Sequence, residues 1–167
     1  MNDPRQTPFT VYRTTVPADW IDYNGHMNDV CYMTACAQAS EVFLDTLGLG
    51  AAYRERTGST LYTAAATIRY HKEARLGDQL TAGTVLVRAD PKRLLVRNTL
   101  WDTAAAELAI AEFLYLHVNQ AKGRVEAMPD DRQTLVNQVL YAHGGHDTPR
   151  PTSPESGLWP SRSDPSG

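Results

Sequence analysis

The chain has 167 residues, 42% of them hydrophobic, which suits one compact domain and is too short for two ordinary ones. A formal net charge of −3 offers no general attraction to nucleic acid or to an anionic membrane surface, so neither is expected as a partner. No apolar run approaches the roughly 18 residues of a spanning helix, and the amino terminus lacks the apolar core of a signal peptide. The two cysteines, Cys31 and Cys36, are expected on different faces of a helix, which disfavours a mutual disulfide and favours a reduced, cytoplasmic protein.

A strand and then a long helix are expected first. Residues 9–16 are rich in β-branched and aromatic side chains, which favours a strand, and Pro17 ends it. From Asp29 to about Leu47 apolar residues recur at steps of three and four, the spacing of a helix, and two glycines stop it. The periodic apolar residues are Val30, Met33, Ala37, Leu44 and Leu47. Small residues form the face expected to be buried, which suits a helix closely wrapped by a curved sheet: Ala35, Cys36, Ala37, Ala39 and Ser40.

Several strands follow. Residues 61–71 alternate, so that the even-numbered side chains from Tyr62 to Tyr70 are expected on one face and Thr63, Thr67, Arg69 and His71 on the other. Further strands are expected at 80–88, 94–101 and 107–119. The connections at 89–93 and 102–106 are too short for parallel crossovers, so these strands must be antiparallel. With a last helix from Pro129 to about Tyr141, the pattern predicts an α+β domain, in which one long central helix packs against an antiparallel sheet of about five strands.

The last 24 residues, 144–167, differ from the rest in composition. They contain five Pro, five Ser and four Gly, with Leu158 and Trp159 as their only large apolar residues. Such a segment cannot bury enough surface to offset its ordering entropy, so a disordered tail is predicted after a domain at 1–143. The pair His143 and His146 leads into this tail without a Cys or an acidic partner at metal-site spacing, and no metal site is expected there.

A dense polar stretch joins the first strand to the long helix. It contains Asp22, Asn24 and His26, and it precedes the unpaired backbone N–H groups near Asp29 and Val30. These N–H groups and the helix dipole favour the oxyanion that develops during acyl transfer. Asp22 could attack a thioester carbonyl or activate water, while Asn24 and His26 could orient the water or the acyl group. The alternative is purely structural: Asp22 or Asn28 caps the helix, Asn24-Gly25 makes a turn, and His26 is an ordinary side chain.

The run Trp20-Ile21-Asp22-Tyr23-Asn24-Gly25-His26-Met27-Asn28 resembles known thioesterases. Its Asp-x-x-Gly core, with Tyr32 ten residues after Asp22, is similar to the hotdog thioesterases of the 4-hydroxybenzoyl-CoA type. The Asp-x-Asn-x-His trio resembles the plant fatty acyl-ACP thioesterases. The whole run resembles the betainyl-CoA thioesterase group of carnitine breakdown, and weaker likenesses extend over residues 9–141. The chain departs from that group at Ala65 and Thr67, where a Glu and a His often stand.

This resemblance implies a single hotdog domain that hydrolyses a short acyl-CoA, with betainyl-CoA as a candidate substrate and Asp22, Asn24 and His26 as catalytic residues. It also implies a homodimer or homotetramer, because hotdog active sites lie between the helix of one subunit and a strand of its partner. No metal and no cofactor beyond the coenzyme A of the substrate is expected. The expected pocket residues are Trp20, Tyr23, Tyr32 and Thr63, whose aromatic members could also bind a quaternary ammonium group or simply pack. Cations for the coenzyme A phosphates are sought in Arg69, Lys92 and Arg93.

Four alternatives to this interpretation concern the catalytic acid, the substrate, the reaction and the presence of catalysis. Glu41, the only Glu of the long helix, lies 12 residues after Asp29, roughly 18 Å at 1.5 Å per residue, and cannot reach a carbonyl held at the helix start of its own chain. A 4-hydroxybenzoyl-CoA-like or medium-chain acyl-CoA substrate remains open. A hydratase is disfavoured because the Asp-x-Asn-Pro-x-His pattern of hotdog hydratases is absent, whereas Ala65 and Thr67 leave open a non-catalytic acyl-CoA-binding module.

Overall fold

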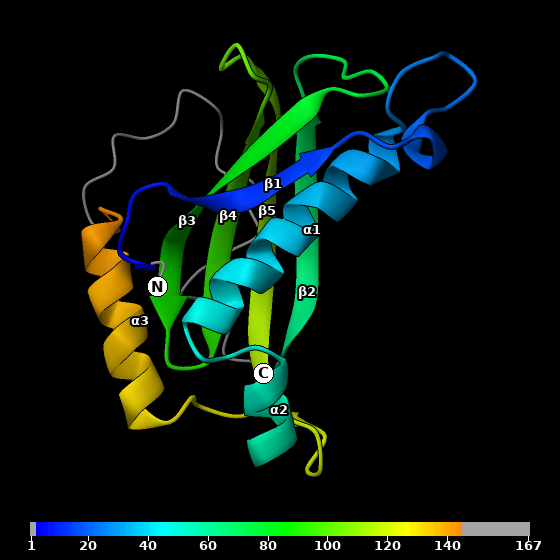
Figure 1. Cartoon of the computed structure of the whole chain (residues 1–167). Helices are drawn as coiled ribbons and strands as arrows, with labels where there is room; N and C mark the ends of the chain where they lie inside the picture. The colour runs from blue at the N-terminus through cyan, green and yellow to red at the C-terminus, as the bar shows by residue number, and fades with distance from the viewer. Residues whose placement is uncertain (1–2, 145–167) are drawn as a thin grey trace.

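One antiparallel sheet organises the chain, and its strand order differs from the chain order. The computed structural model describes residues 3–144, so the predicted tail lies, apart from Gly144, outside the described residues. The five long strands are ordered β1-β3-β4-β5-β2, and the two-residue β6 pairs with β5. In chain order the elements are β1 (Phe9–Thr15), the 3-10 turn η1 (Ala18–Trp20), α1 (Asp29–Thr46), α2 (Ala51–Thr57), β2 (Ser59–Tyr70), β3 (Gln79–Asp90), β4 (Arg93–Trp101), β5 (Glu107–Asn119), β6 (Arg124–Val125) and α3 (Asp130–Ala142) (Figure 1).

Every predicted strand and helix is present, with ends within two residues of those expected. The antiparallel connection predicted at 89–93 is confirmed as a tight hairpin turn, because Asp90 pairs directly with Arg93. The Asp90 carboxylate accepts the backbone N–H of Lys92 at 2.8 Å, which closes the turn. Pro129 immediately precedes α3 instead of occupying its first turn.

Small side chains let α1 lie close to the sheet. Ala35, Cys36, Ala39 and Ser40 are buried on its sheet-facing side, and Figure 1 shows α1 crossing one face of the sheet. A buried polar chain joins three elements there: the Asn98 amide donates to the Ser40 hydroxyl at 2.7 Å, and the Thr84 hydroxyl donates to Asn98 at 2.7 Å. Because each of these groups is satisfied, the chain fixes the position of α1 on β4 and β3 without leaving an unpaired buried polar atom.

The apolar period of α1 is buried only toward the end of the helix, where Leu44 and Leu47 belong to the core. Val30 is 65% exposed, and Met33 and Ala37 are only partly buried. The side chains buried within the chain instead include Tyr32 and Phe43 along with the small residues. Ala37, which was expected on the buried face, packs against the core but is only partly buried. The first half of the helix is thus apolar on two sides, and one of them is only partly covered in the single chain.

A bulge in β2 overturns the prediction of one continuous alternating face. Thr63 pairs with Tyr115, but Ala65 pairs with Leu114, so Ala64 is an extra residue. Because paired residues share a face, Tyr62 lies on the face away from α1, whereas Ala66, Ile68 and Tyr70 lie on the same face as α1. Two-residue alternation cannot reveal such an insertion.

The seven-residue helix α2 was not predicted. Its sequence, Ala-Ala-Tyr-Arg-Glu-Arg-Thr, has one buried side chain, Tyr53, and therefore no apolar period. The Tyr53 hydroxyl contacts His117 Nε2 at 2.9 Å, and His117 Nδ1 contacts the Glu126 carbonyl at 2.9 Å. His117 has a structural role, because both of its ring nitrogens make contacts inside the fold.

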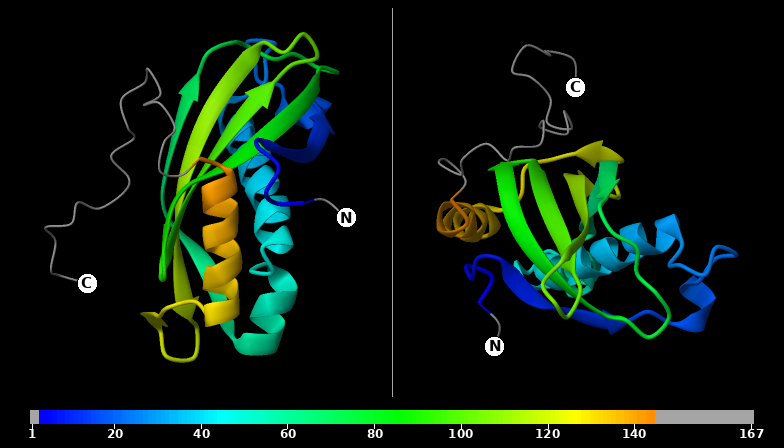
Figure 2. Two further views of the ribbon diagram at one scale, coloured as in Figure 1. Left: turned by 90° about the vertical axis from the view of Figure 1, so that its left-hand side faces the viewer. Right: turned by 90° about the horizontal axis from the view of Figure 1, so that it is seen from above.

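Helix α3 closes the β3 side of the sheet and supports the end of α1 (Figure 2). Val136, Val139 and Leu140 are buried in the common core. The Arg132 guanidinium donates to the Leu47 carbonyl at 3.0 Å, at the carboxyl end of α1. A cation at this position is favoured because it satisfies an unpaired carbonyl and complements the helix dipole.

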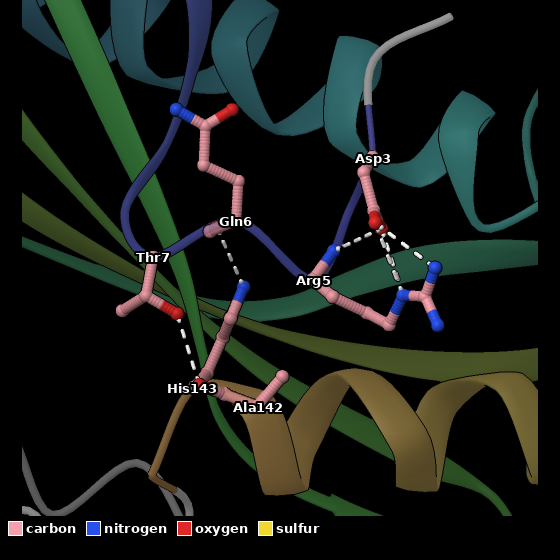
Figure 3. Close-up of polar contacts among 6 residues, drawn as sticks. All are labelled: Asp3, Arg5, Gln6, Thr7, Ala142 and His143. Atoms are coloured by element: carbon pink, nitrogen blue, oxygen red, sulfur yellow. Dashed lines mark hydrogen bonds and ion pairs between the residues drawn. The ribbon is translucent and has the colours of Figure 1, made fainter.

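His143 belongs to the core, although its sequence context suggested the start of the tail. It is 2% exposed and stacks on Phe43, with ring centroids 5.9 Å apart. Its Nδ1 accepts the Leu86 N–H at 2.9 Å, and its Nε2 lies 3.0 Å from the Gln6 carbonyl (Figure 3). Since Nδ1 is an acceptor, the neutral ring carries its proton on Nε2. One imidazole thus joins the amino-terminal segment, β3 and the end of α3.

Candidate active site

The polar stretch before α1 forms a tight loop, residues 22–27. Ile21 and Met27 form an antiparallel bridge, and the Asp22 N–H donates to the His26 carbonyl at 2.9 Å. The Gly25 N–H donates to the Asp22 carbonyl at 3.0 Å, and Gly25 has a φ of +78°. This left-handed conformation is readily adopted by glycine, so Gly25 allows the loop to close on itself.

The structure separates the two roles that were open for Asp22. Its carboxylate accepts the Asn24 N–H at 2.8 Å within the loop. Helix α1 is capped instead by Asn28, whose side-chain oxygen accepts the Val30 N–H at 3.0 Å. Asp22 is only partly buried, and Asn24 and Tyr23 are exposed, with Tyr23 at 97%. The Asp22 carboxylate is therefore not used as the helix cap and can meet a ligand or water.

Of the two amides expected to stabilise an oxyanion, the Val30 amide already has hydrogen-bond acceptors within the chain. The Val30 N–H is occupied twice, by Asn28 and by the Asp29 carboxylate at 2.8 Å. The Asp29 carbonyl accepts the Tyr70 hydroxyl at 3.1 Å, which ties the start of α1 to the end of β2. For the Val30 amide to bind an oxyanion, the two capping side chains would have to turn away. The role of Asp29 and Val30 stays a prediction.

The segment between β2 and β3, residues 71–78, lies against this loop. The Met27 N–H donates to the Ala74 carbonyl at 2.8 Å, and His26 Nε2 lies 3.1 Å from the Glu73 carboxylate. Tyr32 is buried, and its hydroxyl accepts the Ala74 N–H at 2.8 Å. Sequence reasoning missed Glu73 and Ala74, because they lie more than 40 residues from the loop and carry no motif of their own.

The expected pocket residues have different surroundings. Trp20 is partly buried, and its carbonyl accepts the Asn28 N–H at 2.8 Å. The Tyr32 ring meets Tyr70 edge to face with centroids 5.5 Å apart. Burial raises the pKa of Tyr32, so its hydroxyl stays protonated at neutral pH. Trp20 and Tyr23 stay next to Asp22, whereas Tyr32 serves first to hold the 71–78 segment on α1.

The other expected site residues are not gathered around Asp22 within one chain. Thr63 precedes Tyr70 by seven residues of strand, roughly 23 Å at about 3.3 Å per residue. Lys92 and Arg93 stand at the opposite end of β4 from Trp101. Arg69 lies on the face away from α1, and Arg93 pairs with Asp90 at 2.7 Å. A single chain does not bring these residues together with the loop, and their substrate contacts stay predictions.

A second concave region lies near the carboxyl end of α1. A cavity of about 340 Å³ is formed by α1, the start of α2 and the first residues of β2, and its lining includes Glu41, Asp45, Thr60 and Leu61. Glu41 is exposed, so its carboxylate is accessible to solvent and to a ligand. Since Tyr70 anchors the other end of β2 to the start of α1, this cavity and the Asp22 loop lie at opposite ends of both elements.

The remaining reactive groups do not compete with Asp22. Burial raises the pKa of the Cys36 thiol to about 12, so it is not a thiolate nucleophile at neutral pH. Within residues 3–144, no group of three or more His, Cys, Asp and Glu side chains is arranged to hold a metal ion. In the same range, no helix has the length and apolar character needed to cross a bilayer.

Comparison with known proteins identifies relatives of similar sequence. Residues 16–139 match the model of the thioesterase-like superfamily. A Rhizobium meliloti protein named L-carnitine dehydrogenase/betainyl-CoA thioesterase is 32% identical over 143 residues, which cover 85% of this chain and 29% of that protein. A Pseudomonas aeruginosa protein named betainyl-CoA thioesterase is 28% identical over 154 residues, 92% of this chain and 97% of the relative. The chain thus spans under a third of the two-function relative and nearly all of the single-function one.

Solved structures agree with the sequence match. A hypothetical protein of Staphylococcus aureus in complex with CoA has a TM-score of 0.75 at 28% identity, covering 86% of this chain and 88% of that one. A putative thioesterase of Pseudomonas putida has a TM-score of 0.71 at 28% identity, covering 87% and 93%. The family match spans the Asp22 loop and every strand of the sheet except β1, and the chain therefore belongs to the thioesterase-like superfamily.

Proposed function

We propose that this protein is an acyl-CoA thioesterase in which Asp22 is the general base or the nucleophile. The observation that supports the proposal comes from the loop 22–27. The Asp22 carboxylate accepts one backbone N–H there and is not used as the helix cap. In one route Asp22 takes a proton from water as the water attacks the thioester carbonyl. In the other, the carboxylate attacks the carbonyl itself and water cleaves the resulting anhydride. Both release coenzyme A as a thiol and the acyl group as a carboxylic acid.

For the substrate, we favour a short cationic acyl group such as betainyl. The names of the relatives at 28–32% identity support this choice. The aromatic rings of Trp20 and Tyr23 next to Asp22 offer faces for a quaternary ammonium group. The carboxylates of Glu41 and Asp45 in the cavity at the other end of α1 offer opposite charge. In a single chain these rings and carboxylates lie apart. A cationic acyl group can therefore contact both only if a second copy of the chain brings them together.

We also propose a homodimer formed through β2. This strand of 12 residues is at the edge of the sheet, with one side unpaired in the single chain. The partly covered apolar side of α1, formed by Val30, Met33 and Ala37, adds surface that a partner would bury. If two β2 strands pair antiparallel about their middle, the partner's Thr60 lies opposite Arg69, beside the start of α1. The partner's cavity then adjoins the Asp22 loop, and the acyl site is shared between subunits.

The test of the activity is hydrolysis by the wild-type protein and by Asp22→Asn, followed through release of free thiol. A panel of betainyl-, 4-hydroxybenzoyl- and medium-chain acyl-CoA substrates, compared by kcat/KM, identifies the acyl group. We expect the highest kcat/KM for betainyl-CoA, and a loss of about 10²- to 10⁴-fold in kcat for Asp22→Asn. Asp19→Asn is the matched control, because Asp19 is an exposed carboxylate three residues away.

Two results would contradict the proposal. A folded Asp22→Asn protein with wild-type turnover would remove Asp22 from the chemistry. Tight binding of acyl-CoA without release of thiol would instead identify a binding module, the reading that Ala65 and Thr67 leave open.

A further inference from the structure

The carboxylate of Glu73 contacts the ring of His26 although the two residues belong to different segments. His26 Nε2 lies 3.1 Å from Glu73 Oε2, and the side chains are 34% and 50% exposed. Glu73 is on the 71–78 segment, which the Met27–Ala74 and Tyr32–Ala74 hydrogen bonds hold against the loop. The pair is thus formed by two backbone segments that are fixed to each other independently of it.

We propose that Glu73 is a positioning residue for His26, which it holds with the ring proton on Nε2 and the lone pair on Nδ1. An ionised carboxylate only accepts hydrogen bonds, so the nitrogen that faces it must carry the proton. The unprotonated Nδ1 is then the atom that can accept a proton from, or orient, the attacking water. This inference rests on the proposed function, and it assigns a role to a residue that no sequence motif indicated.

Glu73 is itself held in place and kept charged. Its other oxygen accepts a hydrogen bond from the Arg75 guanidinium at 2.8 Å. This hydrogen bond from Arg75, together with the nearby His26, lowers the pKa of Glu73. The Arg75 N–H in turn donates to the Asp78 carboxylate at 2.8 Å, which shapes the turn before β3. The carboxylate therefore presents one oxygen to His26 and is anchored through the other.

Replacement of Glu73 is not expected to detach the 71–78 segment from the loop 22–27. Lys72 pairs with Asp102 at 2.7 Å, and His71 Nδ1 pairs with Glu107 at 2.5 Å. These contacts and the Ala74 hydrogen bonds remain when Glu73 is replaced. Since half-exposed pairs contribute little to stability, the effect on catalysis can be separated from an effect on folding.

The experiment compares Glu73→Ala, Glu73→Asp and Glu107→Ala in the full chain. Glu107→Ala is the matched control, because it removes the carboxylate that pairs with His71, a histidine of the same 71–78 segment whose partner lies on β5. With betainyl-CoA or the best substrate of the panel, we expect Glu73→Ala to lower kcat by about 10-fold with KM within about twofold. Glu73→Asp should recover part of the loss, and Glu107→Ala should keep wild-type kcat.

The second readout is the tautomer of His26, from 15N NMR of the ring nitrogens, with the signal assigned by its absence in His26→Gln. The neutral wild-type ring should carry its proton on Nε2, and Glu73→Ala should give a mixture of both tautomers. A mixed tautomer in the wild type, an unchanged tautomer in Glu73→Ala, or equal kcat for Glu73→Ala and Glu107→Ala overturns the inference. A wild-type protein that hydrolyses no substrate overturns the proposed function and the catalytic role with it, while the spectra still decide whether Glu73 orients the ring.

Discussion

At the scale of single residues, similar side chains before α1 take different tasks. Asn28 caps the helix, whereas Asp22, six residues earlier, closes the loop through Asn24. Sequence preferences could not separate these tasks, because Asp and Asn are both favoured as caps and in turns. The deciding factor is the Ile21–Met27 bridge, which turns the chain back so that the helix starts only after it.

Tyr32 illustrates a residue whose hydroxyl has a structural task in the site. We predict that Tyr32→Phe lowers the free energy of unfolding by about 1–3 kcal/mol, because the buried Ala74 N–H loses its acceptor. Urea unfolding of the variant measures this loss. Tyr141→Phe is the control, since Tyr141 is 82% exposed and its variant should stay within about 0.5 kcal/mol of the wild type. Equal stability of the two variants would show that the Ala74 hydrogen bond is dispensable.

At the scale of elements, the long helix and the strands follow from local pattern, but their modifications do not. Periodicity and turn residues predicted α1, β5 and the Asp90–Arg93 turn closely, since each is encoded by adjacent residues. The bulge at Ala64 was missed because it depends on the register with β5, and α2 because one buried tyrosine makes no period. Likewise, the apolar period of α1 could not reveal that the sheet covers only one of two apolar sides.

The prediction at this scale concerns the partly covered apolar side of α1. We predict that Ala37→Glu turns the proposed dimer into a monomer, because the new charge would be buried in the interface between subunits. Sedimentation velocity of the variant and the wild type measures the change. Ala52→Glu is the control, since Ala52 is exposed on α2 and should leave the dimer intact. A wild-type protein that sediments as a monomer at micromolar concentration would contradict pairing through β2.

At the scale of the whole molecule, His143 joins segments from both ends of the described chain. Burial lowers its pKa below the ordinary value of 6.5, and Nδ1 already accepts the Leu86 N–H. A proton therefore binds the unfolded chain more readily than the folded one at pH values below about 6.5. This histidine accordingly makes the protein less stable as the pH falls below 6.5, until the lower pKa of the folded state is reached.

The prediction is a pH-dependent difference between the wild type and His143→Gln. The wild type should be the more stable at pH 8, and its advantage should shrink between pH 6.5 and 5 by at most about 1.4 kcal/mol per pH unit, the limit for one proton. Urea unfolding at several pH values measures the free energy of unfolding of both proteins. Taking the difference between the two free energies cancels the contributions of the titrating groups that the proteins share. An advantage that stays constant or grows toward pH 5 would show that His143 does not titrate in this way.

The sequence by itself determined the α+β class, the order of the main elements and the polar stretch with Asp22, Asn24 and His26. These features depend on local periods, turn chemistry and residue types, all of which adjacent positions encode. Only the tertiary structure decided that Asn28 and not Asp22 caps α1, that Glu73 meets His26, and that His143 is a core residue. Each of these outcomes depends on contacts between segments far apart in the chain, and such contacts follow from sheet order and packing, which no local pattern encodes.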